Sequence, residues 1–563
     1  MSRRNRIAAA FALIVVLSVA LYARKLDNQF VYDDHAFIAA SHEHENLGNI
    51  PGFFLTDQHR LYRPMRSVIY TIVRQFGNGP LSHHIAGILV HTALCCLLLL
   101  IVLQLSGDLR LATIAAVIAT IHPVHVARVG NMTGSFDLFG MAFAYGAVSA
   151  LIVFLRKDRL WAFFLGIALF TLGLLASEEA ATVPLFLVLI FMAFPSKRSE
   201  PATKRFALTL FLVVIILVAY LRVRSAMIPG FSRVADYQAG GLIGTLMTMS
   251  VVFWRYISLF VAPVGLVAEH SVRIYGVQPK ALIAMAGLAV LAIVAFAVRK
   301  KRPLVFVGIG WFFIGLAPFS NLIPLQTLMA EHYFYSGLNG LAILASIGIC
   351  AVLDAVADKP TTQKAAWGAM VIGAAILFVL SALRVDVWKN DETLWRDAVS
   401  KDPHTYMANL NWSNVLSRQG KTEQAHQHLL EALKYRPSGF EAYNGLGNYY
   451  QDRKNPEKAK EMFLTSLKYY PNNIPGLSGL MQTELVLGNT EQALKIADVL
   501  LRHDGNNIAA LNLMGYILAR SGNCEKAIPY LEKVVAGVHD PGVRDAATAN
   551  LNHCRQKTDP ETQ

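Results

Sequence analysis

The segment EAYNGLGNYYQDRKNPEKAKEMFLTSLKYYP, Glu441 to Pro471, is one unit of an internal repeat. Its apolar residues and its closing proline recur at intervals of 34 residues, in four columns: Ala425, Ala459, Ala493 and Ala527; Leu429, Phe463, Ala497 and Leu531; Trp412, Leu446, Leu480 and Met514; Pro437 and Pro471. Small residues where two helices touch, with larger apolar residues four positions on, are typical of the tetratricopeptide repeat. We therefore predict four helix pairs from Tyr406 to His539, with a capping helix that ends near Cys554.

The chain before the repeats has the composition of a membrane protein. The 563 residues are 54% hydrophobic and only 16% charged, whereas soluble domains carry about 25% charged residues. The sequence predicts an all-α fold, in which a polytopic helical membrane domain precedes a tetratricopeptide-repeat α-solenoid. Eleven apolar segments have the length of transmembrane helices: 7–22, 85–105, 109–126, 136–155, 160–176, 180–195, 206–222, 281–298, 303–320, 336–357 and 365–384.

Domain boundaries follow from these two patterns. We assign 1–384 to the membrane domain, with a long first loop at 24–84, 385–404 to a linker, 405–556 to the repeats with their cap, and 557–563 to a disordered tail. Of the 51 Lys and Arg residues, 31 precede Val385, together with only 17 of the 38 Asp and Glu residues. This basic excess has two interpretations: retention of loops in the cytoplasm, or an anionic substrate such as a lipid phosphate. The chain shows no basic helix or aromatic-interleaved patch, so we expect no nucleic-acid partner.

Loop charge predicts the topology. The basic loops PSKRSEPATKR (195–205) and RKKR (299–302) are expected in the cytoplasm, so an even number of crossings must separate them. Three apolar segments lie between them, and we predict that 242–262 is re-entrant or interfacial because it contains Trp254, Arg255 and Tyr256. The first loop and the C-terminal repeats then lie on the side opposite the cytoplasm. Cys524 and Cys554 could pair there if that compartment is oxidising.

The first loop carries the residues of a candidate active site. Asp33 and Asp34 stand in FVYDDHAF (30–37), and Arg63 and Arg66 stand in LYRPMRS (61–67). A carboxylate that takes a proton from a hydroxyl is a general base, and arginine binds phosphate through two parallel hydrogen bonds. The nearby histidines and carboxylates allow a metal site as an alternative, but their spacing fits no fixed ligand frame, so a divalent metal is possible and not favoured. A plain solvated loop is the other alternative.

Three further polar groups fall on the same side of the predicted topology. They are His122, His125, Arg128 and Asp137 in IHPVHVARVGNMTGSFDLF (121–139), Glu178 and Glu179 in SEEAAT (177–182), and Glu331, His332, Tyr333 and Tyr335 in LIPLQTLMAEHYFYSG (322–337). Carboxylates this close to a bilayer are usually functional or paired. Each group also has an ordinary interpretation, because a histidine before proline can end a helix and a tyrosine can belong to an interfacial belt. Independent polar residues would scatter over both faces, so the shared side favours one site.

Taken together, these motifs resemble the transmembrane and tetratricopeptide-repeat-containing O-mannosyltransferases, within the GT-C superfamily of lipid-dependent glycosyltransferases. The resemblance covers most of the chain and consists of YDD (32–34), YRP (62–64), HHIAGILVH (83–91), HPVH (122–125) with G-x-x-D (134–137), SEE (177–179), AEHYFY (330–335) and the repeats. It implies a sugar donor on a polyprenyl phosphate and an acceptor hydroxyl on a protein. It also implies that Asp33, beside Asp34, is the catalytic base and that Arg63 binds the donor phosphate.

The chain departs from the family pattern at three positions. Ala127 stands where the family usually has Glu, Ser135 where it often has Arg, and His332 where it has Arg after Ala-Glu. Arginine is permanently charged, whereas histidine titrates near neutrality. The sugar and the acceptor can therefore differ from those of the family.

The sequence predicts an integral membrane glycosyltransferase that moves a mannose-like sugar from a polyprenyl-phosphate donor to a protein hydroxyl. Asp33 and Asp34 are the predicted catalytic residues, and Arg63, Arg66 and His332 would bind the donor phosphate. Supporting roles fall to His122, His125, Asp137, Glu178, Glu179, Glu331 and Tyr333. The sequence indicates no definite cofactor. The expected partners are the lipid-linked sugar, a protein acceptor held by the repeats, and membrane lipids.

Two alternatives remain for the function, and one for the location. The acceptor can instead be an envelope glycan or lipid, or the chain can be a non-catalytic scaffold that presents its repeats. A scaffold has no need for Asp33, Asp34 and Arg63 in one loop. Short loops favour a bacterial inner membrane with a periplasmic site, and the endoplasmic reticulum membrane is the alternative setting.

Overall fold

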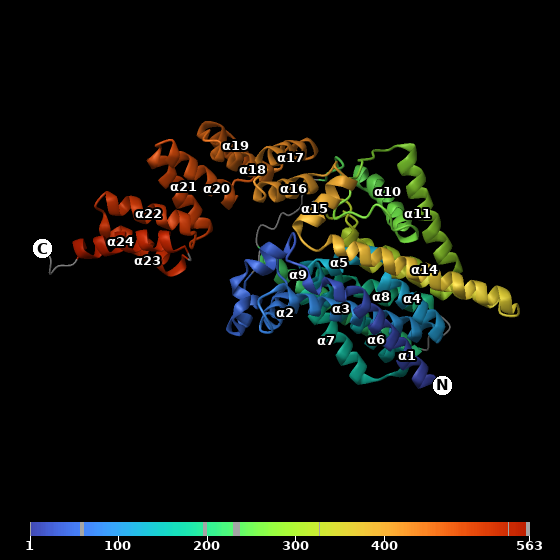
Figure 1. The fold of residues 1–563 in the computed structure, drawn as a ribbon. Coiled ribbons are helices and arrows are strands. Elements are labelled where there is room, and N and C mark those ends of the chain that lie inside the picture. Colours follow the sequence, from blue (N-terminus) through green and yellow to red (C-terminus); the bar gives the residue numbers. More distant parts are fainter. Residues whose placement is uncertain are drawn as a thin grey trace. The chain divides into compact units, whose positions relative to one another are not determined.

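The structure is a computed structural model that describes residues 2–56, 61–194, 200–228, 237–325, 327–538 and 540–558. The described residues form helices and turns without a strand, which confirms the all-α prediction. They divide into two compact units, Met1–Asp402 and Pro403–Gln563. Figure 1 shows the elements of both units along the chain.

The first unit contains twelve helices of 11 or more residues with an apolar sequence among its described residues. They are α1 Arg3–Tyr22, α3 Pro80–Ser106, α4 Leu109–Ile121, α6 Met132–Lys157, α7 Leu160–Ala176, α8 Val183–Ala193, α9 Glu200–Met227, α10 Leu242–Val261, α11 Pro279–Val298, α12 Pro303–Leu316, α13 Tyr335–Ala355 and α14 Pro360–Val387. Helices α3 and α6 contact each other and are two-thirds buried, so they form the centre of the unit. Helix α14 is 6% buried along its most apolar window, as expected of a helix that faces lipid.

Membrane-spanning length is reached by eight of the described helices, and a bent pair makes a possible ninth. The bent pair joins α4 to Pro123–Gly130 at an angle of 50°, where Pro123 ends the first helix. Three of the eleven predicted crossings correspond to helices of only 17, 11 and 14 residues, namely α7, α8 and α12, because turns of 3₁₀-helix replace α-helix at one end of α8 and α12. Helix α10 is one of the eight by length and composition, so its predicted re-entrant or interfacial position stays a prediction.

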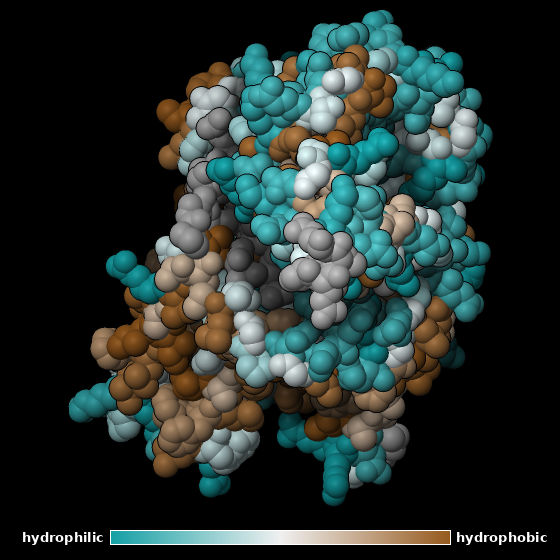
Figure 2. Space-filling model, turned by 90° about the vertical axis from the view of Figure 1, so that its left-hand side faces the viewer, coloured by the Kyte–Doolittle hydropathy of each residue, from teal (hydrophilic) through white to brown (hydrophobic). Residues whose placement is uncertain are grey.

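Exposed apolar side chains are concentrated on the outside of the first unit. They include Val16 of α1, Phe211 of α9, Ile283 of α11 and Ile372 of α14, each more than half exposed. Brown hydrophobic surface is visible across the lower part of Figure 2. In water such a surface would be unfavourable, whereas in a bilayer it faces hydrocarbon. The first unit is therefore a multi-pass membrane domain, as predicted.

The first loop is built from short helical turns rather than irregular chain. It contains η1 Ala23–Asp27, η2 His35–Ala39, η3 His42–Glu45, η4 Leu47–Phe54 and α2 Pro64–Arg74. Residues 57–60 of this loop, residues 195–199 of the first basic loop and the tail beyond Thr558 lie outside the described residues. The predictions made for those three stretches are not addressed by the structure.

The segment 385–404, which we predicted to be a linker, is mostly helical. Helix α14 continues to Val387, and α15 occupies Asp391–Lys401 within the first unit. Asn390 starts α15 with a reciprocal capping box, and its Leu394 and Trp395 are buried. The boundary between the two units falls after Asp402, near the end of the predicted linker, and the residues before it belong to the first unit.

The second unit contains the predicted helix pairs. They are α16 Tyr406–Arg418 with α17 Thr422–Tyr435, α18 Phe440–Asp452 with α19 Pro456–Tyr469, α20 Ile474–Val486 with α21 Thr490–His503, and α22 Ile508–Arg520 with α23 Cys524–Gly537, followed by α24 Pro541–Thr558. The predicted alanine column is buried at all four positions. A disulfide bond joins Cys524 of α23 to Cys554 of α24. The predicted tetratricopeptide-repeat α-solenoid is thus confirmed, and its described residues form four helix pairs followed by α24.

Candidate active site in the membrane unit

Asp34 fastens the first loop to the N-terminus of α6. Its Oδ1 accepts hydrogen bonds from the Thr133 N–H at 2.7 Å and from the Thr133 hydroxyl at 2.9 Å, and its Oδ2 accepts from the N–H groups of Val31 and Met132. The first N–H groups of a helix lack intrahelical partners and attract a negative charge. Asp34 is fully buried, so this bond network rather than solvent surrounds its carboxylate.

Burial raises the pKa of Asp34 from 3.8 to about 6, although its hydrogen bonds with Thr133 and Val31 oppose the shift. A carboxylate in a low-dielectric interior favours its neutral form unless its partners compensate. Asp34 is therefore close to its protonation equilibrium at mildly acidic pH. Its position suits a structural anchor better than a group that contacts substrate.

Asp33 differs from its neighbour because its side chain is only partly buried. It interacts electrostatically with Tyr333 of the AEHYFY segment. The residue before it, Tyr32, has a φ of 53°, a left-handed conformation that is costly for a bulky side chain. After this turn the two adjacent carboxylates differ in exposure: Asp34 is buried and Asp33 is partly exposed.

Arg63 connects three of the predicted polar groups. Its Nε and Nη2 lie 2.7 and 2.6 Å from Glu178 Oε2, and its Nη1 donates to Asp137 Oδ1 at 2.8 Å. Close packing of two backbones brings these groups together, because a Cβ on Gly140 would lie only 2.5 Å from the Cβ of Ser177. The SEE segment therefore lies directly against α6, one turn beyond Asp137.

Three more arginines extend this network. Arg66 donates to Asp137 at 3.1 Å, Arg224 lies 3.5 Å from Glu178, and Arg128 pairs with Glu179 and lies 3.7 Å from Asp137. Four guanidinium groups therefore share three carboxylates, which we call the arginine network (Arg63, Arg66, Arg128, Arg224, Asp137, Glu178 and Glu179). It carries one more positive than negative charge when all three carboxylates are ionised.

The pKa values of the two glutamates in the SEE segment are shifted in opposite directions. Glu179 is buried and the Glu178 side chain is 29% exposed. Desolvation alone raises a carboxyl pKa, but Arg63 and Arg224 outweigh it for Glu178, whose pKa is lowered. Burial dominates for Glu179, whose pKa is raised despite Arg128. Neutralisation of Glu179 would increase the positive excess of the arginine network.

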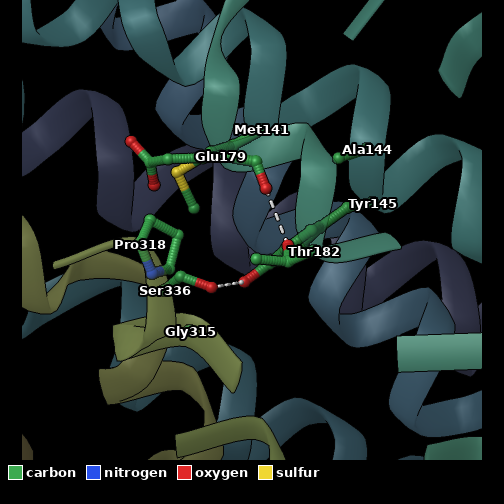
Figure 3. A pocket seen from close by; sticks show the side chains of 8 residues that line it. All are labelled: Met141, Ala144, Tyr145, Glu179, Thr182, Gly315, Pro318 and Ser336. Carbon is green, nitrogen blue, oxygen red and sulfur yellow. Dashed lines mark hydrogen bonds between the residues drawn. The ribbon is translucent and has the colours of Figure 1, made fainter. Parts of the chain in front are cut away.

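Glu179 also lines a small pocket between α6, α12 and α13 (Figure 3). Tyr145, Thr182 and Ser336 supply its other polar groups, and the Tyr145 hydroxyl is 3.2 Å from Ser336 Oγ. Met141 and Pro318 form part of its apolar wall. The arginine network thus borders a partly apolar hollow within the helix bundle.

The predicted histidines have structural partners. His122 Nε2 lies 3.0 Å from the Phe260 carbonyl, and its ring stacks on Phe260. The two ring nitrogens of His125 lie 2.6 and 3.1 Å from the carbonyls of Ala119 and Tyr335. His122 follows the last residue of α4, as a histidine before proline can, and His125 contacts carbonyls near the end of α4 and the start of α13. These partners lie outside the arginine network.

The AEHYFY segment divides between two environments. His332 contributes its carbonyl to Arg128 at 3.5 Å, and Tyr333 stacks on Phe319 at a centroid distance of 4.4 Å. Glu331 instead turns away, is fully buried and lies 3.3 Å from Arg384 at the end of α14. The structure therefore brings Asp137, Glu178, Glu179, Arg63, Arg66 and the His332 backbone together, and it separates Glu331, His122 and His125 from them.

Two members of the arginine network were not among the predicted site residues. Arg128 stands in a motif that the sequence singled out, and only its charge distinguishes it. Arg224 lies at the end of α9, where a basic residue is an ordinary flank of a span. Among the described residues no three His, Cys, Asp or Glu side chains are grouped as metal ligands.

The fold and site define a multi-pass membrane protein with tetratricopeptide repeats. The tetratricopeptide-repeat family model matches residues 410–473. The chain is similar to the protein O-mannosyl-transferase TMTC1 of Homo sapiens, with 23% identity over 536 residues that cover 79% of this chain and 57% of that protein. It is also similar to the protein O-mannosyl-transferase TMTC4 of Homo sapiens, with 23% identity over 74% of this chain and 65% of that protein. These relatives confirm the predicted resemblance.

The chain spans only 57% and 65% of the length of these two relatives. Among solved structures, that of YrrB, a tetratricopeptide-repeat protein with an unusual peptide-binding site, is 24% identical and covers 30% of this chain and 84% of its own, with a TM-score of 0.26.

Proposed function

We propose that this protein is a membrane glycosyltransferase that moves a mannose-like sugar from a polyprenyl phosphate to a hydroxyl group on a protein. The observation that carries the proposal is the arginine network beside the first loop. Its net positive charge suits a phosphate, and the loop that supplies Arg63 also supplies a partly exposed carboxylate at Asp33. The names of the relatives, which are protein O-mannosyl-transferases, support the same reaction.

The proposed reaction is a single displacement. The Asp33 carboxylate takes the proton from the acceptor hydroxyl, and the acceptor oxygen attacks the anomeric carbon of the sugar. The bond between that carbon and the phosphate oxygen breaks, and polyprenyl phosphate leaves with the electron pair. Inversion at the anomeric carbon follows. Arg63 and its neighbours stabilise the leaving phosphate, with binding rather than proton transfer as their role.

The burial of Asp34 refines the roles within the acidic pair. Because both of its oxygens accept hydrogen bonds inside the fold, we assign Asp34 to positioning and Asp33 alone to base catalysis. Arg66 is 5% exposed at its side chain, so it supports Asp137 rather than contacting donor. Arg63 is 19% exposed and is the arginine we assign to the phosphate.

The repeats are assigned to the acceptor protein. Stacked helix pairs build an extended surface that suits a polypeptide, and the disulfide between Cys524 and Cys554 is compatible with an oxidising compartment. We propose that the site and the repeats lie on the periplasmic side of a bacterial inner membrane, which is one such compartment.

The proposal is tested with Asp33→Asn and a matched control, Asp27→Asn, which changes an exposed carboxylate of the same loop. Mass spectrometry of envelope proteins should detect hexose on Ser or Thr in cells with the wild type or Asp27→Asn, and not with Asp33→Asn. A titration of the purified proteins with polyprenyl phosphate should give equal affinities. Glycosylated peptides at normal abundance with Asp33→Asn contradict the base assignment, and their absence with the wild type contradicts the function.

A further inference from the structure

The first loop is held from its outer side by a residue far along the chain. Asp391, the first residue of α15, accepts a hydrogen bond from the Tyr32 N–H at its Oδ1, at 3.0 Å. Its Oδ2 lies 2.9 Å from His35 Nε2. Tyr32 and His35 flank Asp33 and Asp34, so one carboxylate binds both ends of the acidic pair. Asp391 is 13% exposed at its side chain, which favours a persistent bond over a solvent-screened one.

Other contacts make this junction continuous. The Tyr32 ring packs edge-on against Trp395, one turn farther along α15, with a centroid distance of 5.2 Å. Toward the N-terminus, the Gln29 N–H donates to the Lys389 carbonyl at 2.9 Å, and Asn28 donates to the Trp388 carbonyl at 3.1 Å. The whole stretch before Asp33 therefore lies against the start of α15.

Asp33 is thus placed between two independent anchors. Asp34 binds inward, to the N-terminus of α6 through Thr133. Tyr32 and His35 bind outward, to Asp391. The left-handed turn at Tyr32 costs conformational energy, so the surrounding contacts must maintain it. Asp391 is the contact that holds that peptide group directly.

We propose that Asp391 is a positioning residue that sets the place of the Asp33 carboxylate for proton abstraction. This inference rests on the proposed function, in which Asp33 is the base. Asp391 acts through Tyr32 and His35 and contacts neither substrate. Because α15 ends at Lys401 and the repeats begin at Pro403, the anchor lies in the helix that leads directly into the second unit.

A positioning role makes a different prediction from a purely structural one. Misplacement of a catalytic group by about 1 Å can lower a rate by about 100-fold, whereas donor binding depends on Arg63, which Asp391 does not contact. Loss of the anchor should therefore lower kcat and leave the affinity for polyprenyl phosphate unchanged. General destabilisation of the fold would lower both together.

The test compares Asp391→Ala with Glu392→Ala in the full-length purified protein. Both substitutions remove an acidic residue from the first turn of α15, but Glu392 pairs with exposed Arg396 in its own helix. We expect Asp391→Ala to lower kcat about 10- to 100-fold and Glu392→Ala to leave it near normal. Polyprenyl phosphate affinity should be the same in both. Asp391→Asn keeps an oxygen for the Tyr32 N–H and should recover part of the rate.

Hydrogen exchange supplies a readout that does not require activity. The peptide covering residues 30–37 should exchange faster in Asp391→Ala than in Glu392→Ala, because the Tyr32 N–H loses its acceptor. If the wild type transfers no sugar and this exchange still increases, the anchor is supported and the proposed function fails. If the wild type is active and Asp391→Ala matches Glu392→Ala in kcat, the proposed function stands and the positioning role is overturned.

His35→Ala provides a second variant because the His35 ring is half exposed and its loss should not prevent folding. We expect a smaller fall in kcat than with Asp391→Ala, and the double variant should be no slower than Asp391→Ala alone. Additive losses in the double variant would show that His35 acts independently and would overturn the shared anchor.

Discussion

Asp34 accepts hydrogen bonds from both the backbone N–H and the hydroxyl of Thr133, at 2.7 and 2.9 Å, although 99 residues separate the two in the sequence. This relationship distinguishes two carboxylates that are adjacent in the sequence. The first of them, Asp33, remains partly exposed, whereas Asp34 is fully buried. A pair that looks uniform in FVYDDHAF therefore contains one group able to meet substrate and one that builds the site.

The buried state of Asp34 predicts a pH dependence of stability. Its pKa is about 6 in the fold and 3.8 when unperturbed, so the folded state binds more protons than the unfolded state between these values. The free energy of unfolding should therefore fall as pH rises from about 4 to 6, and stay level above that range. The change should be about 3 kcal/mol at most, at 1.36 kcal/mol per pKa unit.

The measurement is the difference in unfolding free energy between the wild type and Asp34→Asn at pH 4, 5, 6 and 7. The asparagine variant removes this titration and keeps an oxygen for Thr133, so other titrating groups cancel in the difference. Parallel pH profiles for the two proteins would contradict the buried, pKa-shifted state of Asp34.

The contacts of Arg63 lead to a second prediction, which concerns the affinity for the donor phosphate. Its fork reaches Asp137 and Glu178 at the same time, and lysine cannot reproduce that planar geometry. Arg63→Lys should weaken polyprenyl phosphate binding about 10- to 100-fold, the equivalent of one charge-assisted hydrogen bond. Arg224→Lys is the control, because the distance from Arg224 to Glu178 is longer, at 3.5 Å. The affinity of this variant should stay within about twofold of the wild type. Equal effects in a titration would contradict the special role of Arg63.

The boundary at Asp402 predicts where the chain can be shortened. A protein ending at Asp402 keeps α15 and should remain folded and bind polyprenyl phosphate, because the first unit is compact without the repeats. A protein ending at Lys389 lacks Leu394 and Trp395, which are buried in that unit, and its first loop should exchange faster. Hydrogen exchange at residues 30–37, with donor titration, compares the two. Equal exchange would show that α15 does not support the loop.

The repeats could be predicted from the sequence because their information is local. Each helix pair repeats the same buried positions, so Ala459 and Phe463 predict the packing of their own unit and of its neighbours. The membrane helices were predicted less completely. The apolar sequences of α8 and α12 do not show where α-helix gives way to a 3₁₀ turn. The proline at position 123 does not show whether the bent helix pair around it forms one span or two.

The site was predicted in its residue types but not in its connections. The motifs around Arg63, Asp137 and Glu178 could be singled out because charges beside a bilayer are unusual. Their pairing could not, since 74 and 115 residues separate Arg63 from its two partners. Asp391 was missed for the same reason, because it lies 356 residues from His35. It also stands in the first turn of a helix, where an acidic residue is ordinary.

The disulfide between Cys524 and Cys554 predicts the compartment of the repeats. A disulfide persists in a periplasm or a lumen and is reduced in the cytoplasm. In membranes prepared with a thiol-blocking reagent, a second maleimide should label these two cysteines only after reduction. Cys95 and Cys350 are buried and free, so the double variant Cys524→Ser/Cys554→Ser supplies the background. The bond closes a loop of 30 residues, and its loss should lower the stability of the last repeat by about 3–4 kcal/mol. Labelling of both cysteines before reduction would place the repeats in the cytoplasm and contradict the topology that puts them on the same side as Asp33.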